Sequence, residues 1–492
     1  MKHIFHTLFF FAFCASQSLA QPNIILIVAD DMGYSDLGCF GSEIETPNLD
    51  KLAQEGIRMR QFYNSAKCEP SRAMIISGQH WHTSGIQLEN GPTIAEVIRR
   101  TNYDTYAVGK WHLSGNPVDR GFDHFFGHLN GATNYFKGDP SFRLDHDKFE
   151  VPDKFYATSA YGDYAVKFIE EGHTANPEKR FFLYLAHTAP HAPLMALPED
   201  IERFKNTYKA GWDKIREERV KRQLKLGIID AKWPVPDRPS TIPAWKDLSP
   251  KEQEIEADRM ATYAAMIYRM DASVGRVINK LEELGIRDNT LIVFISDNGA
   301  NPFDRGRKDV PGALGENHNY GLGWAFASNT PYRLYKQNQH NGGACTSAIL
   351  NWPDVIPPTE KVNDTPVQIL DLAPTFFELA CAKYQAAPDE KPLPGRNLYP
   401  LLTGKKMPPS PSMYFHLYDN AAIIDNNWKL VKAFGNGWEL YNLNTDRAET
   451  QNLISEQPQK AQKLQQEWEN WMGNYRLKHV GNEPKYVPLQ ND

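Results

Sequence analysis

Short runs of apolar residues alternate along this chain with longer segments of helical periodicity. Four of these runs are almost wholly apolar and cover residues 24–29, 105–108, 181–186 and 291–295. Runs of this kind are typical of parallel strands that are buried on both faces. The pattern therefore predicts an α/β fold in which helices sandwich a large mixed sheet whose strands are mostly parallel.

The last part of the chain has a different pattern. Near residues 383–394, Ala, Pro and charged residues replace the apolar periodicity, which indicates a domain boundary. Four short strand-like runs follow, and then a polar helix; they cover residues 413–417, 421–424, 428–431, 439–441 and 457–471. We expect a small α+β domain with an antiparallel sheet and one terminal helix. Upstream, residues 260–284 have strong helical periodicity and predict a helix packed on the core.

The first 20 residues resemble a targeting segment rather than part of the fold. A basic start at Lys2 and His3 precedes an apolar stretch, and small residues surround the predicted cleavage point after Ala20. This pattern predicts a cleavable signal peptide and a periplasmic or secreted mature protein. No segment reaches the roughly 20 apolar residues of a membrane-spanning helix. The predicted organisation is a signal peptide (1–20), a large domain (21–390) and a C-terminal subdomain (391–492).

Composition narrows the class of protein. The chain has 492 residues, 41% of them hydrophobic, and a net charge of −6. This composition indicates a large globular core, and the negative charge argues against nucleic-acid binding. Five cysteines are too few for a disulfide scaffold.

Ionisable or amide side chains follow each of the four predicted strands. In an open α/β sheet, ligands bind beyond the carboxyl ends of the strands, so we expect these side chains to converge. They are Asp30 and Asp31, Lys110 and His112, His187 and His191, and Asp297 and Asn298.

The acidic members of this set predict a metal site. Asp30, Asp31, Asp297 and Asn298 offer only oxygen donors, and three of them are anionic. Crowded carboxylates repel one another unless a cation lies between them. Oxygen donors suit Ca²⁺ or Mg²⁺, whereas zinc prefers Cys and His.

Cys68 lies between the first two of these strands, just before a helix that we expect to begin near Pro70 or Ser71. The helix N-terminus and Arg72 would favour negative charge there, which predicts an anion pocket containing a sulfur atom. The alternative is a buried structural cysteine before an ordinary helix.

The pentapeptide from Cys68 to Arg72, C-E-P-S-R, resembles the signature of the type I sulfatases. Further motifs that match this family follow in the same order. They are N-I-I-L-I-V-A-D-D-M-G (23–33), G-K-W-H (109–112), A-P-H (189–191), S-D-N-G (296–299), P-Y-R-L-Y-K (331–336) and G-R-N-L (395–398). Motifs in this order are specific, whereas one pentapeptide would not be.

The resemblance implies an alkaline phosphatase-like fold and a sulfate monoester hydrolase, with the bacterial arylsulfatases as the most similar branch. Cys68 would be oxidised to formylglycine, whose hydrate is the nucleophile and carries a covalent sulfo-enzyme intermediate. A formylglycine-generating or sulfatase-maturing enzyme would be a partner, and the substrate would be a sulfated small molecule or glycan. Ca²⁺ becomes preferred over Mg²⁺ for Asp30, Asp31, Asp297 and Asn298.

The resemblance also implies roles for the basic residues. Arg72 and Lys110 would hold the hydrate and sulfate oxygens, and His112 would be the base of the second step. His191 and Lys336 would face the leaving-group oxygen. Lys336 follows no apolar run and is assigned by the resemblance alone.

Other expectations concern the surroundings of this site. His187 either lines the pocket or is a plain loop histidine, and His416 of the C-terminal subdomain is a candidate substrate contact. The charged, Pro-rich segment 198–250 resembles an insertion of the bacterial arylsulfatases. It either covers the mouth of the site or is a solvated excursion.

Two departures from the family pattern concern the pocket. Glu69 stands where a small residue is usual and could pair with Lys67 or Arg72, and Asn341 stands where many relatives have Glu. The alternative functions are a phosphonate monoester or phosphodiester hydrolase of the same superfamily, and a glycan-binding pseudoenzyme in which Cys68 is not oxidised. With Cys68 modified, at most one disulfide can form among Cys39, Cys345 and Cys381.

Overall fold

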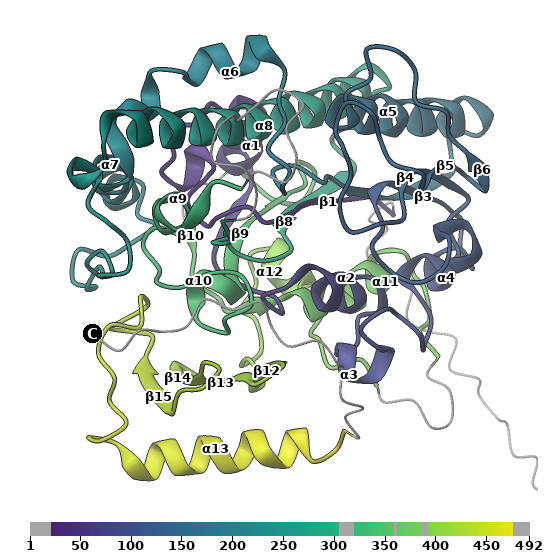
Figure 1. Ribbon diagram of the computed structural model, residues 1–492. Coiled ribbons are helices and arrows are strands. Elements are labelled where there is room, and N and C mark those ends of the chain that lie inside the picture. The colour runs from purple at the N-terminus through teal and green to yellow at the C-terminus, as the bar shows by residue number, and fades with distance from the viewer. Residues whose placement is uncertain (1–20, 305–318, 359–361, 386–391, 476–492) are drawn as a thin grey trace, which may run out of the picture.

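The computed structural model of the protein describes residues 21–304, 319–358, 362–385 and 392–475. Its main feature within these ranges is a sheet of eleven strands (Figure 1). The strands are β1 (Asn23–Ala29), β2 (Ile57–Tyr63), β3 (Tyr103–Lys110), β4 (His124–His128), β5 (Phe142–Leu144), β6 (Asp147–Lys148), β7 (Arg180–Ala186), β8 (Thr290–Ser296), β9 (Cys345–Asn351), β10 (Val362–Asn363) and β11 (Val367–Gln368). Their order is β10-β2-β9-β8-β1-β7-β3-β4-β5-β6, with β11 also paired to β2.

The four apolar runs form the centre of this sheet. β8, β1, β7 and β3 are neighbours and run parallel, whereas β9 pairs antiparallel with both β8 and β2. The register places Ala29, the last residue of β1, opposite Ser296, the last residue of β8. The predicted mixed, mostly parallel sheet is therefore confirmed, and the chain leaves β1 and β8 at the same edge.

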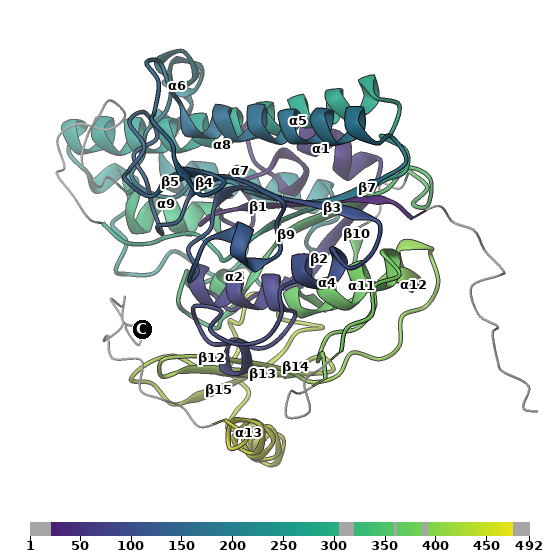
Figure 2. The ribbon, with the colours of Figure 1, turned by 90° about the vertical axis from the view of Figure 1, so that its right-hand side faces the viewer.

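Helices cover both faces of the sheet, as Figure 2 shows. Ile25 and Ile27 of β1 pack on one side with α1, α5 and α8, whereas Ile24 and Leu26 pack on the other side with α2, α4 and α11. Because successive residues of a strand point to opposite faces, an apolar run without alternation is what this double burial requires. These helices are α1 (Pro47–Gln54), α2 (Cys68–Ser77), α4 (Ile94–Ile98), α5 (Ala157–Ala175), α8 (Pro250–Glu283) and α11 (Leu372–Leu379).

The predicted helix over residues 260–284 is confirmed but begins ten residues earlier, at Pro250. Ser249 caps it: the Ser249 side chain accepts a hydrogen bond from the Glu252 N–H, and the Glu252 side chain accepts one from the Ser249 N–H. This capping box supports a polar first segment that has little apolar periodicity. The remaining helices are α3 (Trp81–Ser84), α6 (Pro198–Phe204), α7 (Gly211–Lys225), α9 (Gly321–Ser328), α10 (Asn341–Ala344) and α12 (Tyr399–Leu402).

The segment 198–250 contributes α6 and α7, which pack against α8 and α9 respectively. Arg219 of α7 is buried and pairs with Asp36 at 2.6 Å and with Glu43 at 2.7 Å. Farther along, the Trp233 indole donates to the Asn444 carbonyl. The segment is thus anchored to the rest of the protein, and its place over the mouth of the site stays a prediction.

The C-terminal region has the predicted antiparallel sheet and terminal helix. One face of the sheet packs on α13 through residues such as Leu430 and Leu464, and the other, with Phe415 and Val431, joins the core of the main sheet. The elements are β12 (Met413–Leu417), β13 (Asn420–Asp425), β14 (Trp428–Lys432), β15 (Trp438–Asn442) and α13 (Pro458–Met472). The limits of the two domains stay predictions.

Three further expectations from the sequence concern the signal peptide, membrane-spanning helices and disulfides. The predicted signal peptide, residues 1–20, lies outside the described residues. Within the described ranges, no helix is long and apolar enough to cross a membrane. Cys39, Cys68, Cys345 and Cys381 all have free thiols.

Candidate active site

Polar residues that follow the central strands converge beyond their carboxyl ends. Because β1 and β8 end in register, Asp31 and Asp297 meet, and the Asp31 N–H donates to Asp297 Oδ1 at 3.2 Å. Asn298 Nδ2 donates to Asp31 Oδ1 at 2.7 Å. Asp30, Asp297 and Asn298 are fully buried, and Asp31 is 1% exposed. The structure thus brings together all four residues that the sequence assigned to a metal.

Three cationic side chains face this cluster. Lys110 Nζ lies 2.5 Å from Asp30 Oδ2, Lys336 Nζ lies 2.5 Å from Asp31 Oδ1, and Arg72 Nη2 lies 3.0 Å from Asp297 Oδ2. Arg72 comes from α2, Lys110 ends β3, and Lys336 belongs to the loop between α9 and α10. The cations and carboxylates of the site therefore form one buried electrostatic network.

The network shifts the pKa values of Asp30, which follows β1, and Asp297, which follows β8, in opposite directions. Burial by itself would raise the pKa of Asp30, but Lys110, His191 and Arg72 outweigh it and lower that pKa. For Asp297, burial and the charge of Asp30 raise the pKa well above its ordinary value. Like charges therefore crowd at Asp297 even though Arg72 is present.

Two oxygen atoms in the cluster have no hydrogen-bond partner among the described residues: Asp30 Oδ1 and Asn298 Oδ1. An unsatisfied buried acceptor costs about 1–3 kcal/mol, so such atoms call for a ligand. Both atoms are hard oxygen donors, which are the ligands that Ca²⁺ and Mg²⁺ prefer. The residues present therefore fit a divalent cation.

Cys68 is the first residue of α2, so the helix begins two or three residues before the predicted start near Pro70 or Ser71. The reason is that the Ser71 N–H already bonds to the Lys67 carbonyl at 3.0 Å, and proline fits the first turn because it has no N–H to satisfy. Cys68 is 4% exposed, and Lys336 Nζ lies 3.3 Å from its Sγ. The donor atoms of Cys68, Asp30, Asp31 and His191 lie within 4.8 Å of one another.

The two histidines predicted to move protons flank this group. His191 Nδ1 donates to the Ala192 carbonyl at 2.5 Å, which leaves Nε2 facing Asp31 Oδ2 at 3.4 Å. Burial is the main cause that lowers the pKa of His191 and of His112 to about 4. His112 Nε2 lies 3.5 Å from Glu69 Oε1. Neutral rings at pH 7 can each accept a proton.

Within the described residues, the ring nitrogens of His187 and His416 make no hydrogen bond to this cluster. His187 is fully buried with its ring 6.0 Å from that of Tyr161, and burial lowers its pKa to about 3. This is the position of a core histidine, and it gives no support to the predicted substrate contact. His416 Nδ1 lies 3.0 Å from His82 Nε2, beside the stacked ring of Trp81. Its predicted contact with substrate stays a prediction.

The sequence reasoning missed two residues of the network. Asn301 Nδ2 donates to Asp31 Oδ2 at 2.7 Å, and its Oδ1 accepts from the Phe303 N–H at 3.0 Å, which fixes the orientation of the amide. Its place in the loop after β8, four residues beyond Asp297, could have indicated it. Tyr184 inside β7 accepts from Arg72 Nη1 at 3.3 Å. No pattern distinguishes Tyr184 from a core aromatic residue.

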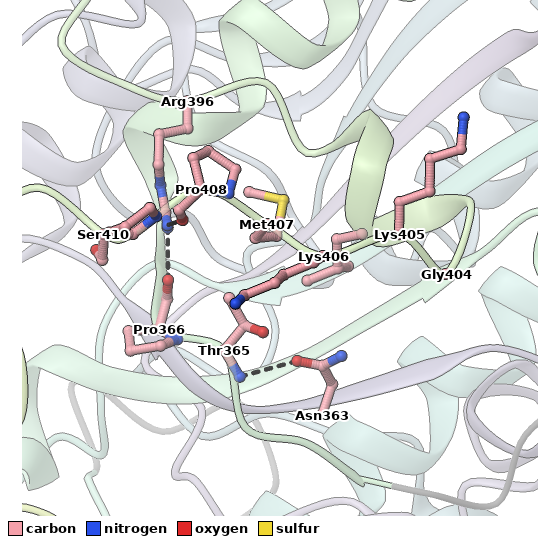
Figure 3. Close-up of a pocket in the computed structure, with 12 residues that line it drawn as sticks. Asn363, Thr365, Pro366, Arg396, Gly404, Lys405, Lys406, Met407, Pro408 and Ser410 are labelled. Carbon is pink, nitrogen blue, oxygen red and sulfur yellow. Dashed lines mark hydrogen bonds between the residues drawn. The ribbon is translucent and has the colours of Figure 1, made fainter.

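A separate cleft of about 410 Å³ lies between the β10–β11 segment and the loop after α12 (Figure 3). Lys405, Lys406 and Met407 line it, and Arg396 at its margin donates to the Pro366 carbonyl. Its lining contains no acidic side chain, histidine or cysteine. This cleft therefore lacks the residue types of the predicted chemistry, and the candidate active site is the buried network around Cys68.

Comparison with known proteins defines the class of this fold and site. The family description "Sulfatase" matches residues 22–382, and "N-sulphoglucosamine sulphohydrolase, C-terminal" matches residues 334–477. The chain belongs to the sulfatase family. An arylsulfatase of Klebsiella aerogenes is 36% identical in an alignment 409 residues long, gaps included, which covers 73% of this chain and 87% of that protein. The protein is accordingly a sulfuric ester hydrolase, as the motifs implied.

Two solved structures show the same fold. One is named Ps i-CgsB in complex with k-i-k-neocarrahexaose. It is 29% identical with a TM-score of 0.71, and the match covers 93% of this chain and 94% of that one. The other, a complex with its substrate D-glucosamine-2-N,6-O-disulfate, is 23% identical with a TM-score of 0.67, and the match covers 92% and 98% of the two chains. The second likeness is one of fold alone.

Proposed function

We propose that this sulfatase cleaves sulfate monoesters with a formylglycine formed from Cys68 as its nucleophile, through a covalent sulfo-enzyme intermediate. The observation that carries the proposal is the place of Cys68: it begins α2, lies 3.3 Å from Lys336, and adjoins the carboxylates that Arg72 and Lys110 neutralise. A formylglycine hydrate would supply an oxygen nucleophile, together with a second hydroxyl through which the aldehyde is regenerated.

Other side chains of the site would bind the sulfate group and transfer protons. Arg72, Lys110 and the N-terminus of α2 favour the anionic oxygens of a sulfate group, because cations and unpaired helix N–H groups stabilise negative charge. The departing oxygen takes a proton from Lys336, which the neighbouring carboxylates keep charged, or from His191 when that ring is protonated, and His112 accepts a proton in the second step. Acid–base groups placed in this way typically contribute about 10²–10⁴-fold each to the rate.

Asp30, Asp31, Asp297 and Asn298 would hold a divalent cation, for which we prefer Ca²⁺ to Mg²⁺. Support comes from their oxygen-only chemistry and from the two unsatisfied oxygens, Asp30 Oδ1 and Asn298 Oδ1. Such a cation would neutralise anionic oxygens of the substrate and relieve the repulsion at Asp297.

Asn301 gives a test of this metal site that does not depend on activity. Its amide orients Asp31, and residues that orient a metal ligand typically affect affinity by about 10–100-fold. We therefore expect Asn301→Ala to weaken Ca²⁺ binding by about tenfold or more, measured by calorimetry on the Cys68 form. The control is Asn130→Ala, which changes a side chain at an exposed turn and should leave the Ca²⁺ affinity unchanged. Asn329→Ala is unsuitable as a control, because the Asn329 amide donates hydrogen bonds to loop carbonyls. Equal affinity in Asn301→Ala and the wild type would contradict this ligand geometry.

We propose a sulfated glycan as the natural substrate, with a small sulfate ester as the alternative. Support comes from the relative of known structure that is 29% identical, which is named as a complex with a neocarrahexaose. The enzyme would be periplasmic or secreted after loss of residues 1–20, and a formylglycine-generating or sulfatase-maturing enzyme would oxidise Cys68.

A substrate panel tests the proposed function. Protein whose formylglycine content is verified by peptide mass should release sulfate from 4-nitrophenyl sulfate and from at least one sulfated oligosaccharide. Rates on bis(4-nitrophenyl) phosphate should be at least about tenfold lower, because the site is expected to favour a sulfate monoester.

Other results would overturn the proposal. Faster hydrolysis of the phosphodiester would favour the phosphonate monoester or phosphodiester hydrolase. An unmodified thiol at residue 68 in protein from its native host would favour the glycan-binding pseudoenzyme. Failure of verified formylglycine protein on every sulfate ester would also refute it.

A further inference from the structure

Glu69 lies between Cys68 and His112 at the edge of the buried network. Its Oε1 is 3.5 Å from His112 Nε2, and its Oε2 is 2.6 Å from Lys67 Nζ. The side chains of these three residues are each about one-fifth exposed, so they border the pocket. A carboxylate in the first turn of a helix is favourable toward the helix dipole, but it also adds negative charge where an anionic substrate would bind. The Glu69 carboxylate therefore calls for a role other than substrate binding.

The position of Glu69 is fixed from two sides. Its backbone belongs to the first turn of α2, and Lys67, which pairs with it, also donates to the Tyr418 hydroxyl at 2.7 Å. Tyr418 follows β12, so the C-terminal sheet holds Lys67 and, through Lys67, Glu69. Burial would raise the pKa of Glu69, but His112 and Lys67 outweigh it and lower that pKa. Glu69 is therefore ionised at pH 7, and its carboxylate is kept in place by Lys67.

His112 has few other restraints on its ring. Its backbone has a φ of +58° and its N–H bonds to the Leu129 carbonyl at 3.2 Å, so the main chain is set in an unusual conformation. The ring lies on Gly131, where an added Cβ would come within 2.4 Å of Nε2. Nδ1 is buried with no hydrogen-bond partner within the described part of the chain. Glu69 is thus the polar group that sets the direction of the imidazole.

We propose that Glu69 is a positioning residue for His112: it holds Nε2 toward its own carboxylate and leaves Nδ1 as the nitrogen that accepts a proton. The proposal rests on the proposed function, in which His112 is a base. A carboxylate favours the tautomer with the proton on the nitrogen that faces it, as in other carboxylate–imidazole pairs. The contacts that run from Tyr418 through Lys67 and Glu69 to His112 also link the C-terminal sheet to the position of the His112 ring.

Crystal structures of the Cys68 form provide a test that needs neither the modification nor a metal. In the wild type we expect one His112 rotamer with Nε2 toward residue 69. In Glu69→Ala the ring should turn or occupy two rotamers, and in Glu69→Gln, whose amide oxygen is still an acceptor, it should keep the wild-type rotamer. An unchanged ring in Glu69→Ala would overturn the proposal.

Kinetics of the matured protein give the second readout. Glu69→Ala should lower kcat by about tenfold with KM within about twofold, since a misplaced base loses part of its contribution. Glu69→Gln should recover at least half of that loss on a logarithmic scale. Glu45→Gln, which removes a carboxylate from a surface pair with Arg203, is the matched control and should equal the wild type.

The outcomes separate the two proposals. A raised KM with unchanged kcat in Glu69→Ala would mean that Glu69 contacts substrate, and would overturn the positioning role. If matured wild-type protein hydrolyses no sulfate ester while the ring of His112 turns in Glu69→Ala, the positioning of His112 stands and the proposed function fails.

Discussion

Cys68→Ala is expected to lower kcat for sulfate monoester hydrolysis by at least about 10³-fold, because removal of a covalent nucleophile leaves only the binding and electrostatic contributions of a site. Among the described residues, the side chains grouped around Cys68 are Asp30, Asp31, His191 and Lys336, and both carboxylates already pair with lysines. Sulfate release from 4-nitrophenyl sulfate, followed by ion chromatography, measures the effect.

Cys381→Ala is the matched control for this variant. Cys381 is an exposed free thiol, and its replacement should leave kcat unchanged. Thermal unfolding of both variants should match the wild type, which would show that any loss in Cys68→Ala is chemical. If Cys68→Ala keeps more than about a tenth of the wild-type kcat, the nucleophile is not at residue 68.

A large effect on stability is expected from a buried ion pair that joins the C-terminal sheet to the loop after Lys336. Lys429 Nζ lies 2.7 Å from Glu449 Oε1 and donates to Asn341 Oδ1 at 2.8 Å, and the Asn341 N–H donates to Glu449 Oε2. Lys429 and Glu449 are fully buried. Asn341, noted in the sequence as a departure from the family pattern, is thus a neutral partner of this pair.

Lys429→Met should lower the free energy of unfolding by about 3–5 kcal/mol, because it leaves the Glu449 charge buried without its partner. Urea denaturation followed by tryptophan fluorescence measures this change. Lys429→Met/Glu449→Gln removes both charges and should recover most of the loss, so the two positions should show a coupling energy of about 2 kcal/mol or more. A double variant less stable than Lys429→Met would contradict the argument.

The control for these variants is an exposed ion pair on the same sheet. Lys432 of β14 pairs with Asp419 at 2.9 Å in a solvent-accessible position. Exposed pairs contribute about 0–1 kcal/mol, so Lys432→Met should change the free energy of unfolding by less than about 1 kcal/mol.

The sequence by itself determined the elements whose burial pattern is regular. The four central strands are buried on both faces and appear as apolar runs, and the pattern predicts the strands of the C-terminal sheet to within one residue at each end. The acidic residues after β1 and β8 could be joined into one site because parallel strands end at the same edge of a sheet. That rule needs only the order of the elements along the chain.

Only the tertiary structure decided which of the remaining residues meet. Lys336 belongs to a loop with no strand before it, and Tyr184 looks like any core aromatic residue, yet both contact the network. His187 follows a strand as His191 does, but its ring is fully buried beside that of Tyr161. Glu69 and His112, or Lys67 and Tyr418, are far apart along the chain. Their contacts depend on how α2, the loop after β3 and the C-terminal sheet pack together, which no local pattern of hydrophobic and polar residues specifies.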